Sequence, residues 1–202
     1  MISVDVRSKS YGDVPVLQDI QFDVEQGQTV AILGPSGIGK STLLRLIAGI
    51  DPKFEGTVSR PKNMAIVFQE PTLLLWRSVF DNIQLIHPEL SESAVREALA
   101  EVGLADKAEL FPGQLSLGQQ RRLSLARGFA GSPDLLIMDE PFVSLDEKTA
   151  DEMLTLTERL ISKTQPATIF VTHDTTEAAR LATQILTLDG QPATLKTKET
   201  LK

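Results

Sequence analysis

Residues 34–42, which read GPSGIGKST, constrain the fold of this chain more than any other segment. They match the pattern G-x-x-x-x-G-K-[ST], which cradles phosphate groups when a strand precedes the loop and a helix follows it. Both neighbours are present, because residues 29–33 form a short apolar run and residues 43–50 carry leucine and isoleucine at helical spacing. The sequence therefore predicts a strand, loop and helix of an α/β fold, with an anion at the loop.

The residue types in this loop explain how it would hold an anion. Its glycines can adopt backbone angles that are closed to other residues, so consecutive N–H groups can turn inward. The helix that follows adds the positive end of its dipole. We expect Lys40 to reach the β- and γ-phosphates of a nucleotide, and Ser41 to supply a hydroxyl to Mg²⁺. The predicted binding residues are Gly34, Pro35, Ser36, Gly37, Ile38, Gly39, Lys40, Ser41 and Thr42. The alternative is a glycine turn that only caps a helix.

A second apolar run, residues 135–138, ends in two adjacent carboxylates, Asp139 and Glu140. A buried strand that ends at Asp139 places this side chain at the carboxyl edge of a sheet, where α/β folds bind ligands and where it can hold Mg²⁺ through water. Glu140 follows as the residue that would orient or deprotonate a water, and phosphoryl transfer requires this more than covalent chemistry. An isolated pair of this kind is more often an acidic turn at the end of a strand.

The rest of the chain alternates between strand and helix patterns. Apolar runs typical of buried strands in a parallel sheet occur at residues 64–68, 168–171 and 185–188. Residues 2–7 and 16–24 predict an antiparallel lobe before the glycine loop. The last residues, after Pro192, are polar, and we expect them to be frayed.

Three further helices have clear start signals. One starts near Ser91, and it lies within residues 71–130, which read as a mostly helical insertion. A later helix begins at Asp146. Another begins after Asp174, a predicted N-cap that has Glu177 three residues on, close to a capping box.

Composition limits the classes of function. Twenty Lys and Arg against 27 Asp and Glu give a net charge of −7, opposite to the footprint of a nucleic-acid binder. We therefore interpret Arg121 and Arg122 as a solvated face or as ion-pair partners. The lack of cysteine, with only His87 and His173 as imidazoles, argues against a structural zinc site. No apolar run approaches the roughly 18 residues of a membrane helix, and the start does not resemble a secretory signal, so we expect a cytoplasmic chain.

Residues 115–140, LSLGQQRRLSLARGFAGSPDLLIMDE, resemble the signature motif followed by the Walker B strand of the ABC ATPases, the engines of ABC transporters. Further motifs follow in the order of this family, so the resemblance covers nearly the whole chain. They are Tyr11, Gln69 in VFQEP, Asp146 in SLDEKT and His173 in FVTHD. On these residues the chain is identified as a member of the family.

The resemblance implies a role for each of these residues. Tyr11 would stack on adenine, Gln69 would lie at the boundary with the helical insertion, and His173 would contact the γ-phosphate. Glu140, His173 and Gln69 would be the catalytic residues, and Ser41, Gln69 and Asp139 would hold the metal. Taken singly, Tyr11 also reads as a half-buried aromatic, Gln69 as a solvent-facing turn residue and His173 as a structural histidine.

In this family the signature serves the nucleotide held by a second subunit, so the resemblance also predicts a head-to-tail dimer around two ATP molecules. Ser116, Gly118, Gln119 and Asp146 would thus contact the nucleotide of the partner. The chain departs from the usual LSGGQ at one position, where Leu117 replaces the first glycine. This leucine either crowds the closed dimer or points away from the nucleotide, and we expect activity to be retained.

The architecture implied by the resemblance is a single ABC ATPase domain over residues 1–202. It would combine a P-loop core with a mostly parallel sheet, an N-terminal antiparallel β lobe and an inserted helical subdomain. Residues 1–70 and 131–202 would form the lobe and the core, and residues from about 71 to 130 the helical subdomain. The chain ends soon after Gly190, so we expect no C-terminal regulatory domain.

ATP and Mg²⁺ are the implied cofactors. The implied partners are a second copy of the chain, transmembrane permease subunits and a solute-binding protein. Nucleic acid is not an expected partner. The permease would place the chain at the cytoplasmic face of the membrane. In the family the permease docks beside the glutamine loop, which corresponds to residues 70–82. Residues 73–75 and Trp76 are candidates for both the core and the dock, and we favour Trp76 as a core residue.

The sequence FQEPTLLLWRSVFDNI looks like that of bacterial importer subunits for nitrate, sulfonates, taurine and related small anions, or for thiamine precursors. An ATPase of an exporter or lipid transporter is the main alternative. A soluble ABC protein of DNA repair or translation is disfavoured, because the insertion is short and the chain is acidic. A simple P-loop GTPase or kinase is disfavoured by the absence of an N-K-x-D motif and would leave LSLGQ unexplained.

Overall fold

The computed structural model of the protein describes residues 1–201, and its contacts divide the chain into two compact units. The sheet unit comprises residues 1–66, residues 134–140 and the segment from Gln165 onward. The helical unit comprises residues 67–133 and 141–164. The single ABC ATPase domain, with its helical part limited to about 71–130, remains a prediction.

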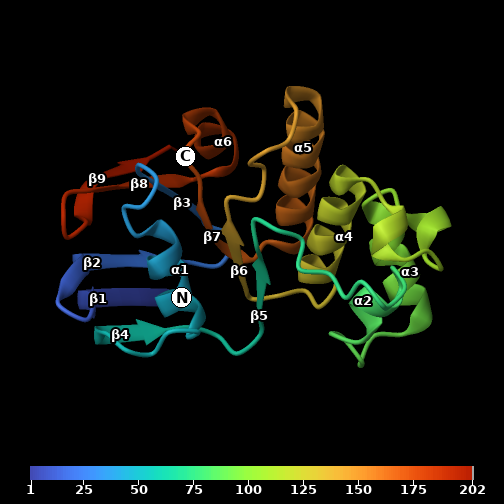
Figure 1. Cartoon of the computed structure of the whole chain (residues 1–202), viewed down its shortest axis with the longest axis horizontal. Coiled ribbons are helices and arrows are strands. Elements are labelled where there is room, and N and C mark those ends of the chain that lie inside the picture. Colours follow the sequence, from blue (N-terminus) through green and yellow to red (C-terminus); the bar gives the residue numbers. More distant parts are fainter. Residues whose placement is uncertain (202) are drawn as a thin grey trace. The chain divides into compact units, whose positions relative to one another are not determined.

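A six-stranded sheet forms the centre of the sheet unit, in the order β5-β6-β7-β3-β8-β9 (Figure 1). β3 (Thr29–Leu33) pairs in parallel with both β7 (Ala167–Val171) and β8 (Gln184–Asp189). β6 (Leu135–Asp139) pairs in parallel with β7, and β5 spans Met64–Val67. Every residue of β7 is buried, as expected of a central parallel strand that is covered on both faces. The predicted, mostly parallel sheet of an α/β fold is confirmed.

The remaining strand of this sheet, β9 (Thr194–Thr200), shows that the prediction of a frayed segment after Pro192 is wrong. β9 pairs antiparallel with β8, with Gln184 opposite Thr200. Its side chains are mostly exposed, which explains the polar sequence, while the backbone N–H and C=O groups that face β8 are satisfied by the ladder. Side-chain polarity alone therefore does not exclude a strand at a sheet edge.

The predicted antiparallel lobe is a second, three-stranded sheet in the order β2-β1-β4 (Figure 1). β1 (Ile2–Tyr11), β2 (Val14–Val24) and β4 (Glu55–Ser59) are its strands. β1 and β2 are longer than the apolar alternation predicts, because only Gly12 and Asp13 separate them. Gly12 has φ 59°, a left-handed angle that suits glycine in a tight turn.

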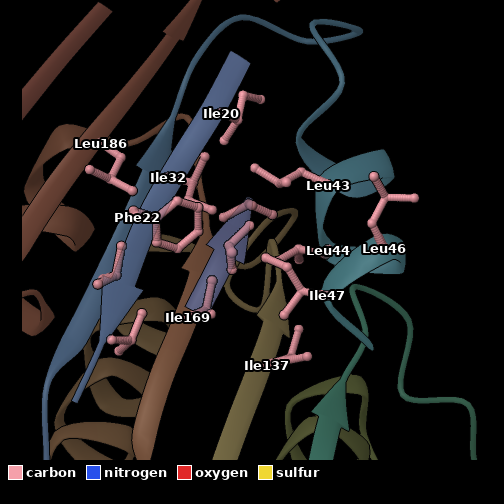
Figure 2. Close-up of a cluster of buried hydrophobic side chains, with 14 of the residues drawn as sticks. Ile20, Phe22, Ile32, Leu43, Leu44, Leu46, Ile47, Ile137, Ile169 and Leu186 are labelled. Carbon is pink, nitrogen blue, oxygen red and sulfur yellow. The ribbon is translucent and has the colours of Figure 1, made fainter. Parts of the chain in front are cut away.

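α1 (Lys40–Ala48) supplies much of the apolar core of the sheet unit. Leu43 and Ile47 have no exposed surface, and Figure 2 shows Leu44 and Ile47 pointing toward the strands. The helix ends at Gly49, whose φ of 72° is left-handed. Because the helix begins at Lys40, the same packing that buries its leucines also fixes its polar first turn.

The helical unit contains the predicted insertion. Its helices are α2 (Asp81–Gln84), α3 (Glu92–Glu101), α4 (Leu117–Phe129) and α5 (Glu147–Thr164), with 3₁₀ turns at Ala105–Lys107 and Pro112–Gln114. The helix predicted to start near Ser91 is α3, and Ser91 caps it by accepting a hydrogen bond from the N–H of Ala94 at 3.2 Å. Asp146 caps α5 by accepting from the N–H of Thr149 at 3.0 Å. Within residues 1–201, no helix is long and apolar enough to cross a membrane.

The two adjacent arginines of α4 have different surroundings. Arg122 pairs with Glu152 at 2.7 Å, as expected for an ion-pair partner. Arg121 is only 7% exposed and donates to the carbonyl of Pro141 at 2.7 Å, so the interpretation as a solvated or ion-paired side chain is wrong for this residue. Burial also lowers the pKa of Arg121.

The prediction that Trp76 belongs to the core is wrong, because its side chain is 71% exposed. The turn that carries it is held instead by Asn82, which is fully buried. Asn82 Oδ1 accepts from the N–H of Leu74 at 2.8 Å, and Asn82 Nδ2 donates to the carbonyl of Ser78 at 2.8 Å. Because a side-chain amide orders this backbone, the indole and the neighbouring Leu75 remain at the surface.

Candidate nucleotide-binding and hydrolysis site

The glycine loop runs from the end of β3 into α1 and has the backbone that the sequence predicts. Gly37 and Gly39 have φ of 79° and 114°, which side chains rarely adopt. Space excludes a side chain as well, because a Cβ on Gly39 would lie 2.8 Å from Cδ2 of Leu17. The loop is therefore packed against β2 while its backbone curves, which fits a cradle for phosphate groups.

Lys40 is the buried cation of this loop, with only 4% of its surface exposed. Its Nζ donates to the carbonyls of Gly34 at 2.8 Å and Pro35 at 3.2 Å, and lies 3.6 Å from Oε1 of Glu140. A buried ammonium is stable only with such partners. These contacts hold the charge at the loop, where a phosphate would meet it.

Ser41 and Asp139 are brought together by the first turn of α1 and the end of β6. Ser41 Oγ donates to Oδ1 of Asp139 at 3.1 Å. Burial raises the pKa of Asp139, and the hydrogen bond from Ser41 opposes that effect. A hydroxyl and a carboxylate at this spacing fit Mg²⁺, which prefers oxygen ligands and keeps several waters.

Glu140 stands between two other candidate residues. Its Oε1 faces Nζ of Lys40, and its Oε2 lies 3.5 Å from Nδ1 of His173. The backbone of Glu140 has φ 45°, a left-handed angle that costs on the order of 1 kcal/mol for a residue with a side chain. Its N–H donates to the carbonyl of Val171 at 3.1 Å, which fixes this turn. Such strain is concentrated at functional sites, and no residue type in the sequence indicated it.

The parallel pairing of β6 and β7 explains why Glu140 and His173 meet. Asp139 lies opposite Val171 in the ladder, so the residues that follow these strands emerge at the same edge of the sheet. The side chain of His173 is 56% exposed, and that of Glu140 is 19% exposed. The site therefore has a half-buried acid beside an accessible imidazole.

A hydroxyl holds the backbone around His173. The predicted N-cap of α6 (Thr175–Leu181) is confirmed, because Asp174 Oδ1 accepts from the N–H groups of Thr176 and Glu177. The reciprocal half of a capping box is absent. The N–H of Asp174 donates instead to Oγ1 of Thr172 at 3.0 Å, and the Thr172 hydroxyl donates to Oε2 of Glu177 in a short bond. Burial raises the pKa of Glu177, and the bond from Thr172 opposes that effect.

Tyr11 is 48% exposed at the end of β1 and belongs to a polar cluster that the sequence did not indicate. Its hydroxyl donates to Oδ2 of Asp51 at 3.2 Å, and Nζ of Lys9 lies 4.4 Å from its ring centroid. Lys9 is 3% exposed and pairs with Asp51 at 2.6 Å, which lowers the pKa of Asp51. One accessible aromatic ring is thus held in place, and its stacking on adenine stays a prediction.

The signature residues gather within the helical unit. Ser116 caps α4, since its hydroxyl accepts from the N–H of Gln119 at 3.3 Å while Oε1 of Gln119 accepts from the N–H of Ser116 at 3.0 Å. Ser116, Gly118, Gln119 and Asp146 all line one cavity of about 540 Å³. Leu117 also lines this cavity and is 49% exposed, so it is not a core residue.

Gln69 lies in the helical unit, shortly after β5, with an exposed side chain. Its catalytic and metal-binding roles stay predictions. The sequence did not identify Lys9, Asp51 and Thr172 in the sheet unit, and it indicated Glu177 only as part of a capping box. Each acts through a contact between segments far apart or through a hydroxyl, and neither leaves a periodic signal in the sequence.

Comparison with known proteins gives consistent matches. The model of the ABC transporter family matches residues 17–143. The aliphatic sulfonates import ATP-binding protein SsuB 1 of Paracoccus denitrificans (strain Pd 1222) is 45% identical over 193 residues, which cover 94% of this chain and 80% of that protein. SsuB 3 of Rhodococcus jostii (strain RHA1), of the same description, is 42% identical over 94% of this chain and 71% of its own length. A dimeric structure of an ATP-binding cassette in a post-hydrolysis state, bound to ADP and Pi, is 26% identical with a TM-score of 0.85, covering 100% of this chain and 99% of that chain.

Proposed function

Because this chain belongs to the ABC transporter family, we propose that it is the ATP-hydrolysing motor subunit of a bacterial importer of small sulfonates. Family membership makes the chain an ATPase that binds ATP with Mg²⁺. It acts with a membrane permease from the cytoplasmic side, as an import ATP-binding subunit does. The substrate, the form of the dimer and the role of each residue are the proposed parts.

The observation that carries the proposed hydrolysis is the row of ionisable side chains at one edge of the sheet. Lys40 lies 3.6 Å from Glu140, and Glu140 lies 3.5 Å from His173. In this arrangement Lys40 would bind the terminal phosphates of ATP, and Glu140 would accept a proton from the attacking water. His173 would donate a hydrogen bond toward the γ-phosphate, and its accessible imidazole supports that role.

The proposed metal ligands are the hydroxyl of Ser41 and the carboxylate of Asp139, together with Gln69. The hydrogen bond between Ser41 and Asp139 supports this assignment, because it brings the two oxygens to 3.1 Å from each other. Mg²⁺ bound there would neutralise phosphate charge during hydrolysis. The raised pKa of Asp139 also agrees with a carboxylate whose charge needs a cation nearby.

The proposed dimer is head-to-tail, with each chain contributing two different half-sites. The first half-site is the glycine loop with Asp139, Glu140 and His173 in the sheet unit. The second comprises Ser116, Gly118, Gln119 and Asp146, whose shared cavity supports a common ligand. That ligand would be the nucleotide of the partner, with the N-terminus of α4 directed at its phosphates. ATP would close the dimer, and hydrolysis would reopen it.

The proposed permease contact lies on residues 70–82. The exposure of Leu75 and Trp76 supports this proposal, because large apolar side chains at 63% and 71% exposure indicate a contact surface. The names of the relatives support sulfonate as the solute, and a solute-binding protein would deliver it. An exporter or lipid-transporter ATPase is the weaker alternative.

Reconstitution of the chain with its permease in vesicles tests the proposed substrate. ATP-dependent uptake of a labelled alkanesulfonate, dependent on the solute-binding protein, is the expected result. Nitrate and a thiamine precursor are the matched competitors. Uptake of either of these without sulfonate uptake would reject the sulfonate assignment, and extrusion of solute from the ATP side would favour the exporter.

A further inference from the structure

The side chain of His173 lies largely outside the packed core. Its imidazole is 56% exposed, and its described contact is with Oε2 of Glu140 at 3.5 Å. An exposed side chain keeps rotamer freedom, so the fixed part of its geometry is the position and direction of its Cα–Cβ bond, which the backbone sets. The position of this imidazole therefore depends on the segment from Thr172 to Asp174.

On the N-terminal side, the sheet fixes this segment. Thr172 is 2% exposed, and its N–H donates to the carbonyl of Ile32 at 3.3 Å, which extends the ladder between β7 and β3 by one residue. The carbonyl of Val171 accepts from the N–H of Glu140 at 3.1 Å. The end of β7 thus aligns the backbones of both Glu140 and His173.

On the C-terminal side, the side chain of Thr172 fixes the segment. Its hydroxyl accepts from the N–H of Asp174 at 3.0 Å, so it spans the backbone of His173. A hydroxyl has a single proton, and here Glu177 accepts it through Oε2. Glu177 lies in α6, which Asp174 caps, so the carboxylate connects the start of this helix to the end of β7.

We propose that Thr172 and Glu177 are positioning residues that hold His173 beside Glu140. Glu177 orients the hydroxyl proton of Thr172, and the lone pairs of the same oxygen are thereby directed at the N–H of Asp174. Loss of either partner frees the backbone on one side of His173 without removing any group that touches the nucleotide. The inference rests on the proposed role of His173 in hydrolysis.

Paired variants of the full chain test this proposal by their ATPase kinetics. Glu177→Ala and Thr172→Val remove the bond, whereas Glu177→Gln and Thr172→Ser retain an acceptor and a hydroxyl. We expect the first pair to lower kcat about tenfold, with KM for ATP within about twofold, and the second pair to stay close to the parent chain. Ala179→Gly is the matched control, because it weakens the exposed face of α6 and leaves Thr172 unchanged.

A double-mutant cycle with His173→Ala separates positioning from general destabilisation. If Glu177 acts through His173, adding Glu177→Ala to His173→Ala lowers kcat by less than about twofold. An equal loss in both backgrounds, or full kcat in Glu177→Ala, would overturn the proposal. A parent chain without ATPase activity would instead count against the proposed function, so the two failures are distinguishable.

The two histidines of the sequence permit a readout that does not depend on turnover. In a full chain labelled at histidine, NMR gives one Cε1–H signal for His173 and one for His87, whose Nε2 donates to the carbonyl of Arg127 in the helical unit. Glu177→Ala should shift or broaden the signal of His173 and leave that of His87 unchanged. An unchanged His173 signal would reject the positioning role, and a change in both signals would indicate general unfolding and reject it as well.

Discussion

Replacing Glu140 by Gln should abolish turnover while preserving ATP binding. The amide has nearly the same shape as the carboxylate, so the left-handed turn and the hydrogen bond from the N–H of Glu140 to Val171 are retained. The change removes the group that would accept a proton from water. General-base catalysis contributes about 10²- to 10⁴-fold, and we expect kcat to fall by that factor.

The geometry also determines the direction of the effect on binding. Oε1 of Glu140 lies 3.6 Å from Nζ of Lys40, whose side chain is 4% exposed. Two unit charges about 4 Å apart attract by at most about 4 kcal/mol at an effective dielectric constant near 20. In Glu140→Gln this competing carboxylate is absent, and Lys40 keeps only its bonds to the carbonyls of Gly34 and Pro35 when it meets the phosphates of ATP. The Kd for ATP should therefore stay equal or decrease.

Three measurements on purified chain check this prediction. They are phosphate release under single-turnover conditions, the equilibrium Kd for ATP, and the molar mass in the presence of Mg²⁺ and ATP, which should report a stable dimer. Glu199→Gln in β9 is the matched control, because it makes the same charge change on an exposed strand. Hydrolysis at the parental rate would refute the role of Glu140, and a large loss of ATP affinity would refute the electrostatic reasoning.

Three other variants test separate parts of the structure. Gly118→Asp should inhibit hydrolysis without weakening ATP binding by the monomer, although the Cβ of the new side chain would lie 3.2 Å from Cγ2 of Thr149. Loss of ATP binding by the monomer would contradict the proposal that the signature contacts the nucleotide of the partner. Asp139→Asn should raise Tm at pH 7 in EDTA by up to about 4 °C and eliminate Mg²⁺-dependent turnover. Burial raises the pKa of Asp139 in the folded chain above its ordinary value of 3.8. The protonated carboxyl therefore favours the folded state below pH 3.8, and this stabilisation is lost as the pH rises through the folded pKa. The gain in Tm should thus shrink toward pH 4 in melts at several pH values, and a constant gain would contradict this. Trp76→Ala should change the free energy of unfolding by less than about 0.5 kcal/mol and weaken copurification with the permease, whereas a strongly destabilised chain would contradict the observed exposure.

Local patterns predicted the elements that carry the main site. The glycine loop, the strand that ends at Asp139 and the cap at Asp174 depend on neighbours in sequence, and all three occur in the structure. The apolar runs indicated parallel strands, and the strand that ends at Asp139 indicated that this side chain lies at a carboxyl edge. The pairing of β6 with β7, which brings Glu140 and His173 to the same edge, came from the structure.

Other features depend on contacts that no local pattern encodes. Trp76 is apolar but exposed, on a turn that the buried Asn82 orders with hydrogen bonds. β9 is polar, yet it is a strand because β8 offers an unpaired edge. In both cases the backbone partner, and not the character of the side chain, determines the outcome.

The sequence by itself determined the α/β class, the phosphate loop, the acidic pair and the family, because each is written in residue types at fixed spacing. Only the tertiary structure decided how Glu140 is held at φ 45° and how Thr172 and Glu177 enclose the backbone of His173. The physical reason is the reach of the interactions. Helical spacing and glycine angles act over a few residues, whereas a hydrogen bond at a site joins whichever groups the packed sheet brings within about 3 Å.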